Sequence, residues 1–260
     1  MKVKNQKLKV SLFMKILGVI PARYASSRFP GKPLVDLGGQ SMIQRVYAQA
    51  RLSTVLNKVV VATDDQRIYD HIISFGGEAC MTSEHHPSGT DRCYEALEKE
   101  KSTFDYVINI QGDEPFIEPG QIDLLASLLN GETQLATLIK LIDTEEQLYS
   151  VGEVKVTFNK NYEALYFSRA VIPFLHKVEQ SEWLKKYDFY KHVGMYAYRA
   201  DILKEITSLK LSVLEQAESL EQLRWMENGF TVKVGITEVE TMCVDTPEDL
   251  EKARVYFAAK

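Results

Sequence analysis

A cationic segment follows the first apolar run of the chain. Residues 21–33 read PARYASSRFPGKP and place Arg23, Arg28 and Lys32 in one connection. Guanidinium and ammonium groups beside small residues are suited to hold a polyphosphate. The segment is not a Walker loop, because Pro33 follows Gly-Lys where Ser or Thr is required, and it lacks the glycine spacing of a dinucleotide fingerprint. We predict a phosphate cradle; a solvated basic loop is the alternative.

Two acidic motifs come at the ends of predicted strands. QGDEP places Asp113 after the strand expected at 106–110, and VDTPEDL places Asp245 between the last strand and the last helix. Mg²⁺ favours one or two carboxylates together with substrate phosphates and water. The pair therefore predicts a magnesium site at one edge of the sheet, with Gly112 allowing a close backbone approach. The alternative is that each Asp caps the helix that follows it.

A third motif, HPSGTDR, leads into a helix expected over residues 93–99. Ser88 and Thr90 are helix-capping residue types, and Gly89 permits an unusual backbone conformation. Arg92 or the loop amides are candidates to read a base or a phosphate. A capped loop without a ligand explains the same residues equally well.

Scattered polar residues of the second half are further candidates. His192 and Tyr196 lie four residues apart on a strand-like run, so their side chains share one face. Taken alone, each of these residues is more often structural than functional. The remaining members of the set are Ser168, Arg169, Glu221 and Gln222.

Composition restricts the classes of function. The 260 residues are 45% hydrophobic and 26% charged, which is typical of a globular protein. A net charge of −5 disfavours nucleic-acid binding, because neutralising phosphates needs a basic face. Three cysteines are too few for a disulfide framework, and no apolar run approaches the ~18 residues of a membrane span, so we expect a cytoplasmic protein. Cys80, His85, His86 and Cys93 fit no common zinc spacing.

Strand-like and helical patterns alternate along the first half of the chain. Strands are expected at 16–20, 58–62 and 106–110, and helices at 40–52, 65–75 and 119–129. This alternation predicts an α/β fold with a doubly wound parallel sheet covered by helices on both faces.

The second half has a different pattern, with several strand-like runs close together. These runs are 134–142, 154–158, 164–167, 192–198 and 231–236, with helices expected at 199–207, 214–227 and 247–258. We predict one domain over residues 14–260 with an inserted mixed-strand lobe at about 140–200. Residues 1–13 are predicted to be a basic N-terminal extension.

Eight segments, taken together and in order, resemble the 3-deoxy-manno-octulosonate (Kdo) cytidylyltransferase family. They are IPARYASSRFPGKPL, VVVATDD, HPSGTDR, INIQGDEP, ALYFSRAVIP, KHVGMYAYR, LEQAESLEQLR and VDTPEDLEKAR. The resemblance implies a nucleotidyltransferase-type (GT-A-like) α/β fold and a homodimer formed through the inserted lobe. It also implies transfer of CMP from CTP to the anomeric hydroxyl of Kdo, with release of pyrophosphate, for lipopolysaccharide biosynthesis.

The resemblance also implies a role for each matching residue. Arg23 and Lys32 would hold the CTP phosphates, with Arg28 in the same loop, and Asp113 and Asp245 would ligate Mg²⁺. The nucleotide pocket would include Ser88, Gly89, Arg92 and Gln111. The acid sugar would be surrounded by Gln111, Arg169, His192, Tyr196, Glu221 and Gln222. Arg169 is the candidate partner of the sugar carboxylate, because a guanidinium binds it bidentately.

Three other functions are compatible with parts of this pattern. A cytidylyltransferase for a related acid sugar, such as 8-amino-Kdo or a sialic acid, would use the same residues. A glycosyltransferase on a similar sheet would normally need an Asp-x-Asp motif, which QGDEP is not. A non-catalytic nucleotide sensor would not need a complete sugar pocket. The sequence departs from the family at residues 1–13, at 150–153 and at Val213, where a proline is usual.

Overall fold

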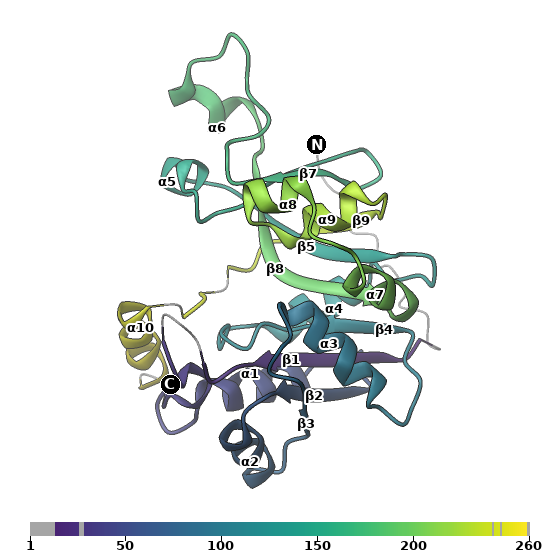
Figure 1. Cartoon of the computed structure of the whole chain (residues 1–260). Helices are drawn as coiled ribbons and strands as arrows, with labels where there is room; N and C mark the ends of the chain where they lie inside the picture. The colour runs from purple at the N-terminus through teal and green to yellow at the C-terminus, as the bar shows by residue number, and fades with distance from the viewer. Residues whose placement is uncertain (1–13, 26–28, 241, 245, 259–260) are drawn as a thin grey trace.

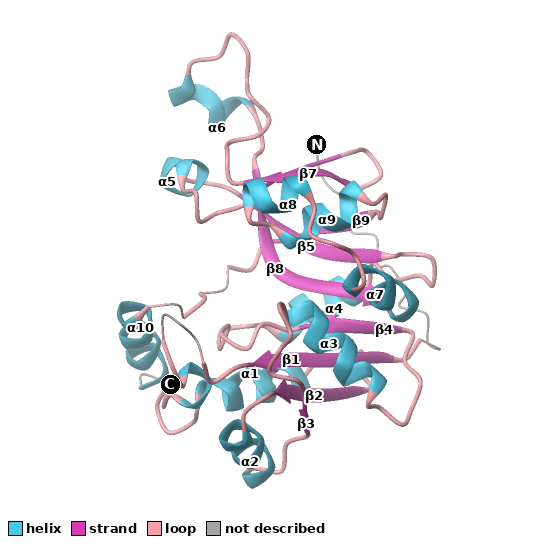
Figure 2. Ribbon diagram, in the orientation of Figure 1, coloured by secondary structure: helices cyan, strands magenta, loops and turns pink. Residues whose placement is uncertain are grey.

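A computed structural model describes residues 14–25, 29–240, 242–244 and 246–258. The described chain is built on one nine-stranded mixed sheet with the strand order β3-β2-β1-β4-β8-β5-β9; β6 also pairs with β8, and β7 pairs with β6 (Figure 1, Figure 2). The strands are β1 Ile16–Ala22, β2 Lys58–Thr63, β3 Ala79–Met81, β4 Tyr106–Asn109, β5 Leu135–Leu141, β6 Lys155–Phe158, β7 Ala164–Ser168, β8 Tyr190–Arg199 and β9 Val232–Thr237.

The first half of the sheet is parallel, as predicted, and the second half is mixed. β1 pairs in parallel with β2 and β4. β8 then lies antiparallel between β4 and β5, and β5 pairs in parallel with β9. The α/β prediction is therefore confirmed, but the sheet is not parallel throughout. The lobe predicted at about 140–200 shares its last strand, β8, with the centre of the main sheet.

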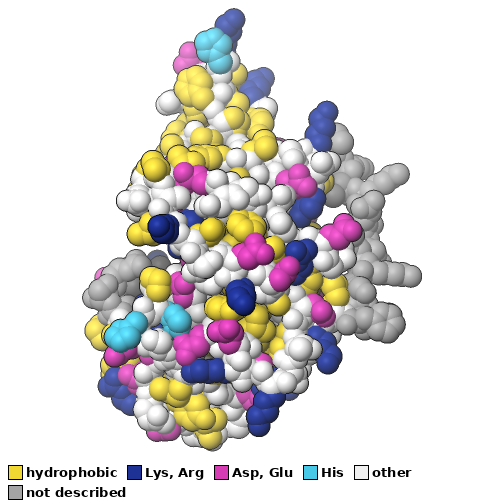
Figure 3. All heavy atoms as spheres, turned by 45° about the vertical axis from the view of Figure 1, so that its right-hand side comes forward, with side chains coloured by type: hydrophobic (Ala, Val, Ile, Leu, Met, Phe, Trp, Pro, Cys, Tyr) yellow, Lys and Arg dark blue, Asp and Glu magenta, His cyan; other side chains and the backbone are white. Residues whose placement is uncertain are grey.

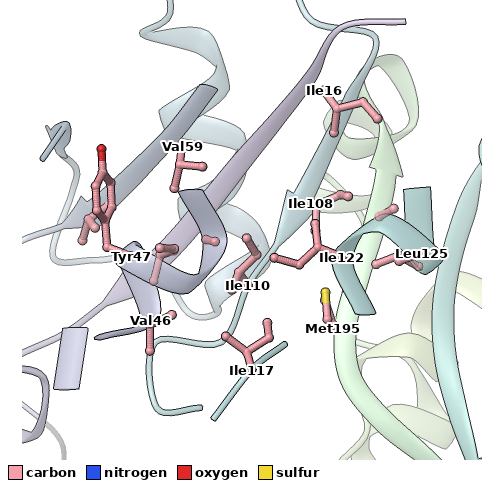
Figure 4. Packing of buried hydrophobic residues seen from close by; sticks show 14 of the residues in the cluster. Ile16, Val46, Tyr47, Val59, Ile108, Ile110, Ile117, Ile122, Leu125 and Met195 are labelled. Carbon is pink, nitrogen blue, oxygen red and sulfur yellow. The ribbon is translucent and has the colours of Figure 1, made fainter. Parts of the chain in front are cut away.

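Helices pack on both faces of the sheet. One face is covered by α1 (Met42–Arg51), α2 (Gln66–Ser74) and α4 (Pro119–Ala126), whose buried residues join those of the strands in one core cluster. Figure 4 shows Val46 and Ile122 of two of these helices near Ile108 and Ile110. The other face is covered by α3 (Gly89–Glu98), α7 (Ala200–Thr207) and α9 (Glu221–Glu227). All three strands and all three helices predicted in the first half are present.

The single helix predicted over residues 214–227 is wrong. The chain forms α8 (Val213–Glu218) and α9 instead, separated by Ser219, which has a left-handed backbone with φ of 53°. Apolar periodicity continues across this break, so the pattern alone does not reveal it. A capping box between Ser212 and Glu215 begins α8, with Val213 at its first position. The helix predicted from residue 93 begins earlier, at Gly89.

Residues 170–189 project from the sheet between β7 and β8 and carry the short helix α6 (Trp183–Lys186) (Figure 1). Trp183 and Phe189 pack there with Leu148 of α5 (Glu145–Tyr149) in a small separate core. Figure 3 shows hydrophobic side chains gathered on this projection. Phe174 remains 69% exposed. None of the described helices is both long and apolar enough to cross a membrane.

The chain returns to the first half of the sheet after β9. The connection leads to α10 (Pro247–Ala258), which lies beside the α1 end of the molecule (Figure 1). Leu250 and Ala253 of α10 pack against Leu37 and Met42. Residues from the far end of the sequence are in this way brought to the edge where β1 and β4 end.

Candidate active site

The carboxyl ends of β1, β2 and β4 meet at one edge of the sheet, because these strands are parallel. The loop after β4 lies directly against the end of β1 at Gly112. A Cβ added there would be only 2.7 Å from the carbonyl oxygen of Pro21. The QGDEP motif therefore requires glycine at this position for its close packing against the protein's own backbone.

This close approach brings the cationic segment to the acidic motif. Lys32 is buried, and its Nζ lies 2.9 Å from Oδ2 of Asp113. Gly31, with φ of 75°, donates its N–H to the carbonyl of Tyr24 at 2.9 Å and closes the neck of the segment. The structure confirms that the two motifs adjoin. Arg28 lies outside the described residues.

Arg23 is anchored to the third motif. Its guanidinium donates to the carbonyl oxygen of His86, and burial, followed by the charge of Arg92, lowers its pKa. The His86 ring in turn contacts the carboxylate of Glu95 on α3. Bonds from Lys99, the Ser83 amide and His86 lower the pKa of Glu95 to about 2 against the opposing effect of burial. The loop that precedes α3 is thus held by Arg23 on one side and by Glu95 on the other.

The HPSGTDR motif forms the start of α3. Ser88 is the N-cap and accepts hydrogen bonds from the amides of Thr90 and Asp91, so the predicted capping chemistry is present. Gly89 is the first helical residue and has no positive φ, so the unusual backbone predicted there is absent.

The role predicted for Arg92, contact with a base or a phosphate, stays a prediction. Its side chain is fully buried, with Nη2 2.7 Å from Oδ2 of Asp64 and Nη1 bonded to the Thr82 hydroxyl. In this arrangement Arg92 holds the loops after β2 and β3, and its charge acts on Arg23. Asp64 lies 28 residues from Arg92 in sequence, so no local pattern marks the pair.

The predicted sugar-side residues gather on β8. His192 is mostly enclosed, and desolvation lowers its pKa to about 4, so the ring is neutral at pH 7. Its Nε2 lies 3.0 Å from the hydroxyl of Thr137, and its ring centroid lies 5.0 Å from that of Tyr196. The two residues share a face as predicted. The buried hydroxyl of Tyr196 has no hydrogen-bond partner within the described part of the chain.

Gln111 connects this strand to the QGDEP motif. Its Nε2 donates to the carbonyl of Gly194 at 2.7 Å, where β8 is irregular in its pairing with β5. The irregularity releases the Gly194 carbonyl from the ladder and turns it toward the loop after β4. Gln111 therefore joins the loop after β4 to β8, and its predicted contacts with nucleotide and sugar stay predictions.

Glu221 and Gln222 begin α9 on the same side. The Glu221 carboxylate accepts hydrogen bonds from the hydroxyls of Ser88 at 2.9 Å and Thr90 at 2.7 Å. Burial raises its pKa, and the bonds from Thr90 and Ser88 oppose that effect. Gln222 is buried. The structure thus joins two motifs that the sequence separates by more than a hundred residues.

Arg169 is engaged with backbone carbonyls. It donates to those of Glu218 at 2.8 Å, Val151 at 2.9 Å and Ser219 at 3.4 Å. The Glu218 carboxylate accepts the Ser168 hydroxyl and the Arg169 amide. The Arg169 side chain therefore joins the 151 loop to the break between α8 and α9.

The sequence analysis missed three charged residues near this side. Lys155 is fully buried, and its Nζ donates to the carbonyls of Ser150 and Glu153 at 2.8 and 2.7 Å. Arg224 is buried between two glutamates. Glu218 is described above. A lysine inside an apolar strand is a signal that identifies Lys155, whereas nothing local distinguishes the other two from surface residues.

Asp245 lies outside the described residues. The residue before it, Val244, donates its N–H to the carbonyl oxygen of Asp113 at 3.1 Å. Across the described ranges, no group of three or more His, Cys, Asp or Glu side chains is placed to hold a metal ion.

The chain matches known proteins over nearly its whole length. The family model described as Cytidylyltransferase matches residues 17–250. A 3-deoxy-manno-octulosonate cytidylyltransferase of Parabacteroides distasonis is 56% identical over 94% of this chain and 99% of its own. One of Phocaeicola vulgatus is 57% identical over 94% of this chain and 98% of its own.

Solved structures agree with these relatives. A CMP:2-keto-3-deoxy-manno-octonic acid synthetase complexed with CTP superposes with a TM-score of 0.88 at 43% identity, covering 94% of this chain and 99% of its own. A cytidylyltransferase of Leptospira borgpetersenii, at 16% identity and a TM-score of 0.60, covers 95% of this chain and 88% of its own and shares the fold alone. The chain therefore belongs to the 3-deoxy-manno-octulosonate cytidylyltransferase family.

Proposed function

We propose that this protein transfers CMP from CTP to the anomeric hydroxyl of Kdo and releases pyrophosphate. The observation that carries the proposal is the edge of the sheet at which Lys32, Asp113, Gln111 and the β8 residues meet, in a chain 56% identical to a Kdo cytidylyltransferase. The anomeric oxygen would attack the α-phosphorus in line, and the bond from that phosphorus to the pyrophosphate oxygen would break.

The nucleotide would bind against the cationic segment. Lys32 is held in place by Asp113, and Arg23 by the His86 carbonyl, so both cations are positioned before CTP arrives. Because they are already desolvated, little reorganisation is needed when charge develops on the α- and β-phosphate oxygens. Arg28 of the same loop would add to this charge, and the start of α3 at Ser88 would border the base.

Mg²⁺ would be held by Asp113 and Asp245. The donor set fits, because Mg²⁺ is commonly bound by one or two carboxylates with the remaining positions filled by substrate phosphates and water. The bond from Val244 to the Asp113 carbonyl supports this pairing. Bound Mg²⁺ would neutralise charge on the phosphates and lower the pKa of a coordinated hydroxyl. Lys32 would keep the Asp113 carboxylate oriented toward the phosphates.

The sugar would lie beside β8 and the start of α9. The unpartnered Tyr196 hydroxyl and the neutral His192 ring are suited to bond sugar hydroxyls. Arg169 uses three of its five N–H donors on carbonyls of the described chain, which leaves two for the sugar carboxylate. Glu221 and Gln222 would complete this side.

The finer assignments belong to the same proposal. We place the sheet among GT-A-like nucleotidyltransferases, supported by the TM-score of 0.88 to the CTP-bound neighbour. The exposed Phe174 and the other apolar side chains on the projection of residues 170–189 support a homodimer through the inserted lobe. A CTP substrate and the thiols of Cys80 and Cys93, neither of which is in a disulfide, support a cytoplasmic reaction that supplies lipopolysaccharide biosynthesis.

The direct test is release of pyrophosphate from CTP, Mg²⁺ and Kdo. Parallel reactions contain UTP in place of CTP, a sialic acid or 8-amino-Kdo in place of Kdo, and EDTA in place of Mg²⁺. We expect release only with CTP, Mg²⁺ and Kdo. Faster release with another acid sugar would transfer the assignment to that sugar, and no release with any sugar would favour a nucleotide sensor.

A further inference from the structure

Arg224, which has no role in the proposed function, lies between two glutamates, one of which is the sugar-side residue Glu221. Its Nε is 3.1 Å from the Glu215 carboxylate of α8, and its Nη2 is 3.1 Å from the Glu221 carboxylate of its own helix. Its Nη1 donates to the carbonyl of Leu209 at 3.2 Å, before α8. The side chains of Arg224 and Glu215 are only 10% and 11% exposed. We call these three charged residues the Arg224 cluster.

Glu221 extends the Arg224 cluster to the opposite side of the site. Its two oxygens accept from Ser88 and Thr90 at the start of α3, while Arg224 bonds the same oxygen as Ser88. Ser88 has one hydroxyl hydrogen, and it also lies 2.6 Å from the Asp91 carboxylate. Arg224 is therefore the donor that keeps the Glu221 carboxylate turned toward α3 whichever carboxylate Ser88 bonds.

The groups that surround Glu221 disfavour its charged form, so its carboxylate needs a nearby cation to stay ionised. Asp91 on α3 is a nearby negative charge and acts with burial to raise the pKa of Glu221. The phenol of Tyr198 on β8 lies 3.3 Å from the Thr90 hydroxyl, and the buried Cys93 thiol feels the charges of both Glu221 and Arg92. Among the described neighbours, Arg224 is the cation that faces the Glu221 carboxylate.

We propose that Arg224 is a positioning residue that fixes the ionised Glu221 carboxylate between the nucleotide-side loop and the sugar side, so that sugar binding depends on Arg224. The inference rests on the proposed function and deepens it. Arg224 supplies the positive charge beside Glu221, and its guanidinium is held in place by the Leu209 carbonyl and by the charge of Glu215, 3.1 Å from its Nε.

The test compares kcat/KM for Kdo between about pH 5.5 and about pH 9 in Arg224→Met and in the unsubstituted protein. Loss of the cation raises the pKa of the buried Glu221 carboxylate. We therefore expect the acid limb of the plot of kcat/KM against pH to move to higher pH by about one unit. On that limb kcat/KM falls about tenfold, activity recovers at high pH, and KM for CTP stays within about twofold. Arg224→Lys restores the limb because it returns the charge.

Arg199→Met is the matched control. Arg199 also pairs with a carboxylate, that of Asp201 at 2.7 Å, and its Nη1 bonds the carbonyls of Gly131 and Glu132. We expect its pH profile to match that of the unsubstituted protein. If Arg224→Met does not fold, Thr90→Val removes a donor to the same carboxylate and shifts the limb in the same direction.

The inference is overturned if folded Arg224→Met has the same acid limb as the unsubstituted protein. It is also overturned if kcat/KM for Kdo falls equally at every pH while KM for CTP rises. Either result leaves the proposed function intact. Unsubstituted protein that releases no pyrophosphate with any acid sugar overturns the proposed function and this inference together.

Discussion

Gly112 offers a sharp test of how the site is assembled, because its substitution by alanine has a calculable geometry. The added Cβ would lie 2.7 Å from the carbonyl oxygen of Pro21, below the 3.0 Å at which real Cβ atoms are essentially never seen. The two backbone segments must separate by at least about 0.3 Å. Overpacking of this kind costs about 1–3 kcal/mol. At about 2–4 °C per kcal/mol for a chain of this size, we expect a Tm lower by about 2–12 °C.

The same displacement should also lower the rate of the reaction. Gln111 and Asp113 flank Gly112, so a shift there moves the groups that contact Gly194 and Lys32. A misplacement of about 1 Å costs about a hundredfold in rate, so about 0.3 Å costs roughly fivefold. Scanning calorimetry or dye-based melting measures the first effect, and pyrophosphate release at saturating CTP and Kdo measures the second.

Gly120→Ala is the control for this substitution. Gly120 lies in the first turn of α4 with an ordinary φ, and a Cβ there meets nothing within 4 Å. Its replacement by alanine should stabilise the fold by about 0.4–1 kcal/mol through the unfolded chain, with turnover unchanged. If Gly112→Ala melts within about 1 °C of the unsubstituted protein and turns over within about twofold, the close approach at Pro21 does not hold the site together.

Three further substitutions test single groups. Lys32→Ala removes a buried cation from the phosphate cradle and should cost about 2 kcal/mol, seen as a roughly thirtyfold lower kcat/KM for CTP in steady-state kinetics. Asp113→Asn keeps an oxygen for Lys32 but loses the charge, so kcat at saturating Mg²⁺ should fall by at least about a hundredfold. His192→Gln removes a ring whose pKa is lowered to about 4 in the folded state. The unfolded ring takes up its proton near pH 6.5, so the free energy of unfolding of the unsubstituted protein should fall as pH falls from about 6.5 to about 4. The variant should show a smaller fall, measured by urea titrations at these two pH values.

Each of these expectations has a clear contrary result. Unchanged CTP kinetics would remove Lys32 from the cradle, and near-normal turnover of Asp113→Asn at high Mg²⁺ would remove Asp113 from the metal site. Parallel loss of stability in His192→Gln and the unsubstituted protein would show that another group titrates in that pH range.

Much of the first half of the fold follows from local signals. Ser41, Asp65 and Ser88 cap the helices that they precede, and the apolar run of β2 is buried as a central parallel strand should be. Caps, turns and periodicity act within a few residues, so they can be recognised in a single sequence. The break at Ser219 could not, because both flanking segments keep a helical pattern.

The sequence by itself determined which chemical groups this protein possesses and where each stands along the chain: the cations of residues 23–32, the carboxylate of Asp113 after a strand, and the motifs shared with its family. Only the tertiary structure decided how they are used. It enclosed Arg92 against Asp64, joined Glu221 to Thr90 across 131 positions, and pressed Gly112 onto Pro21. Such contacts depend on the order and register of distant strands, and a side chain carries no local mark of the partner that folding brings to it.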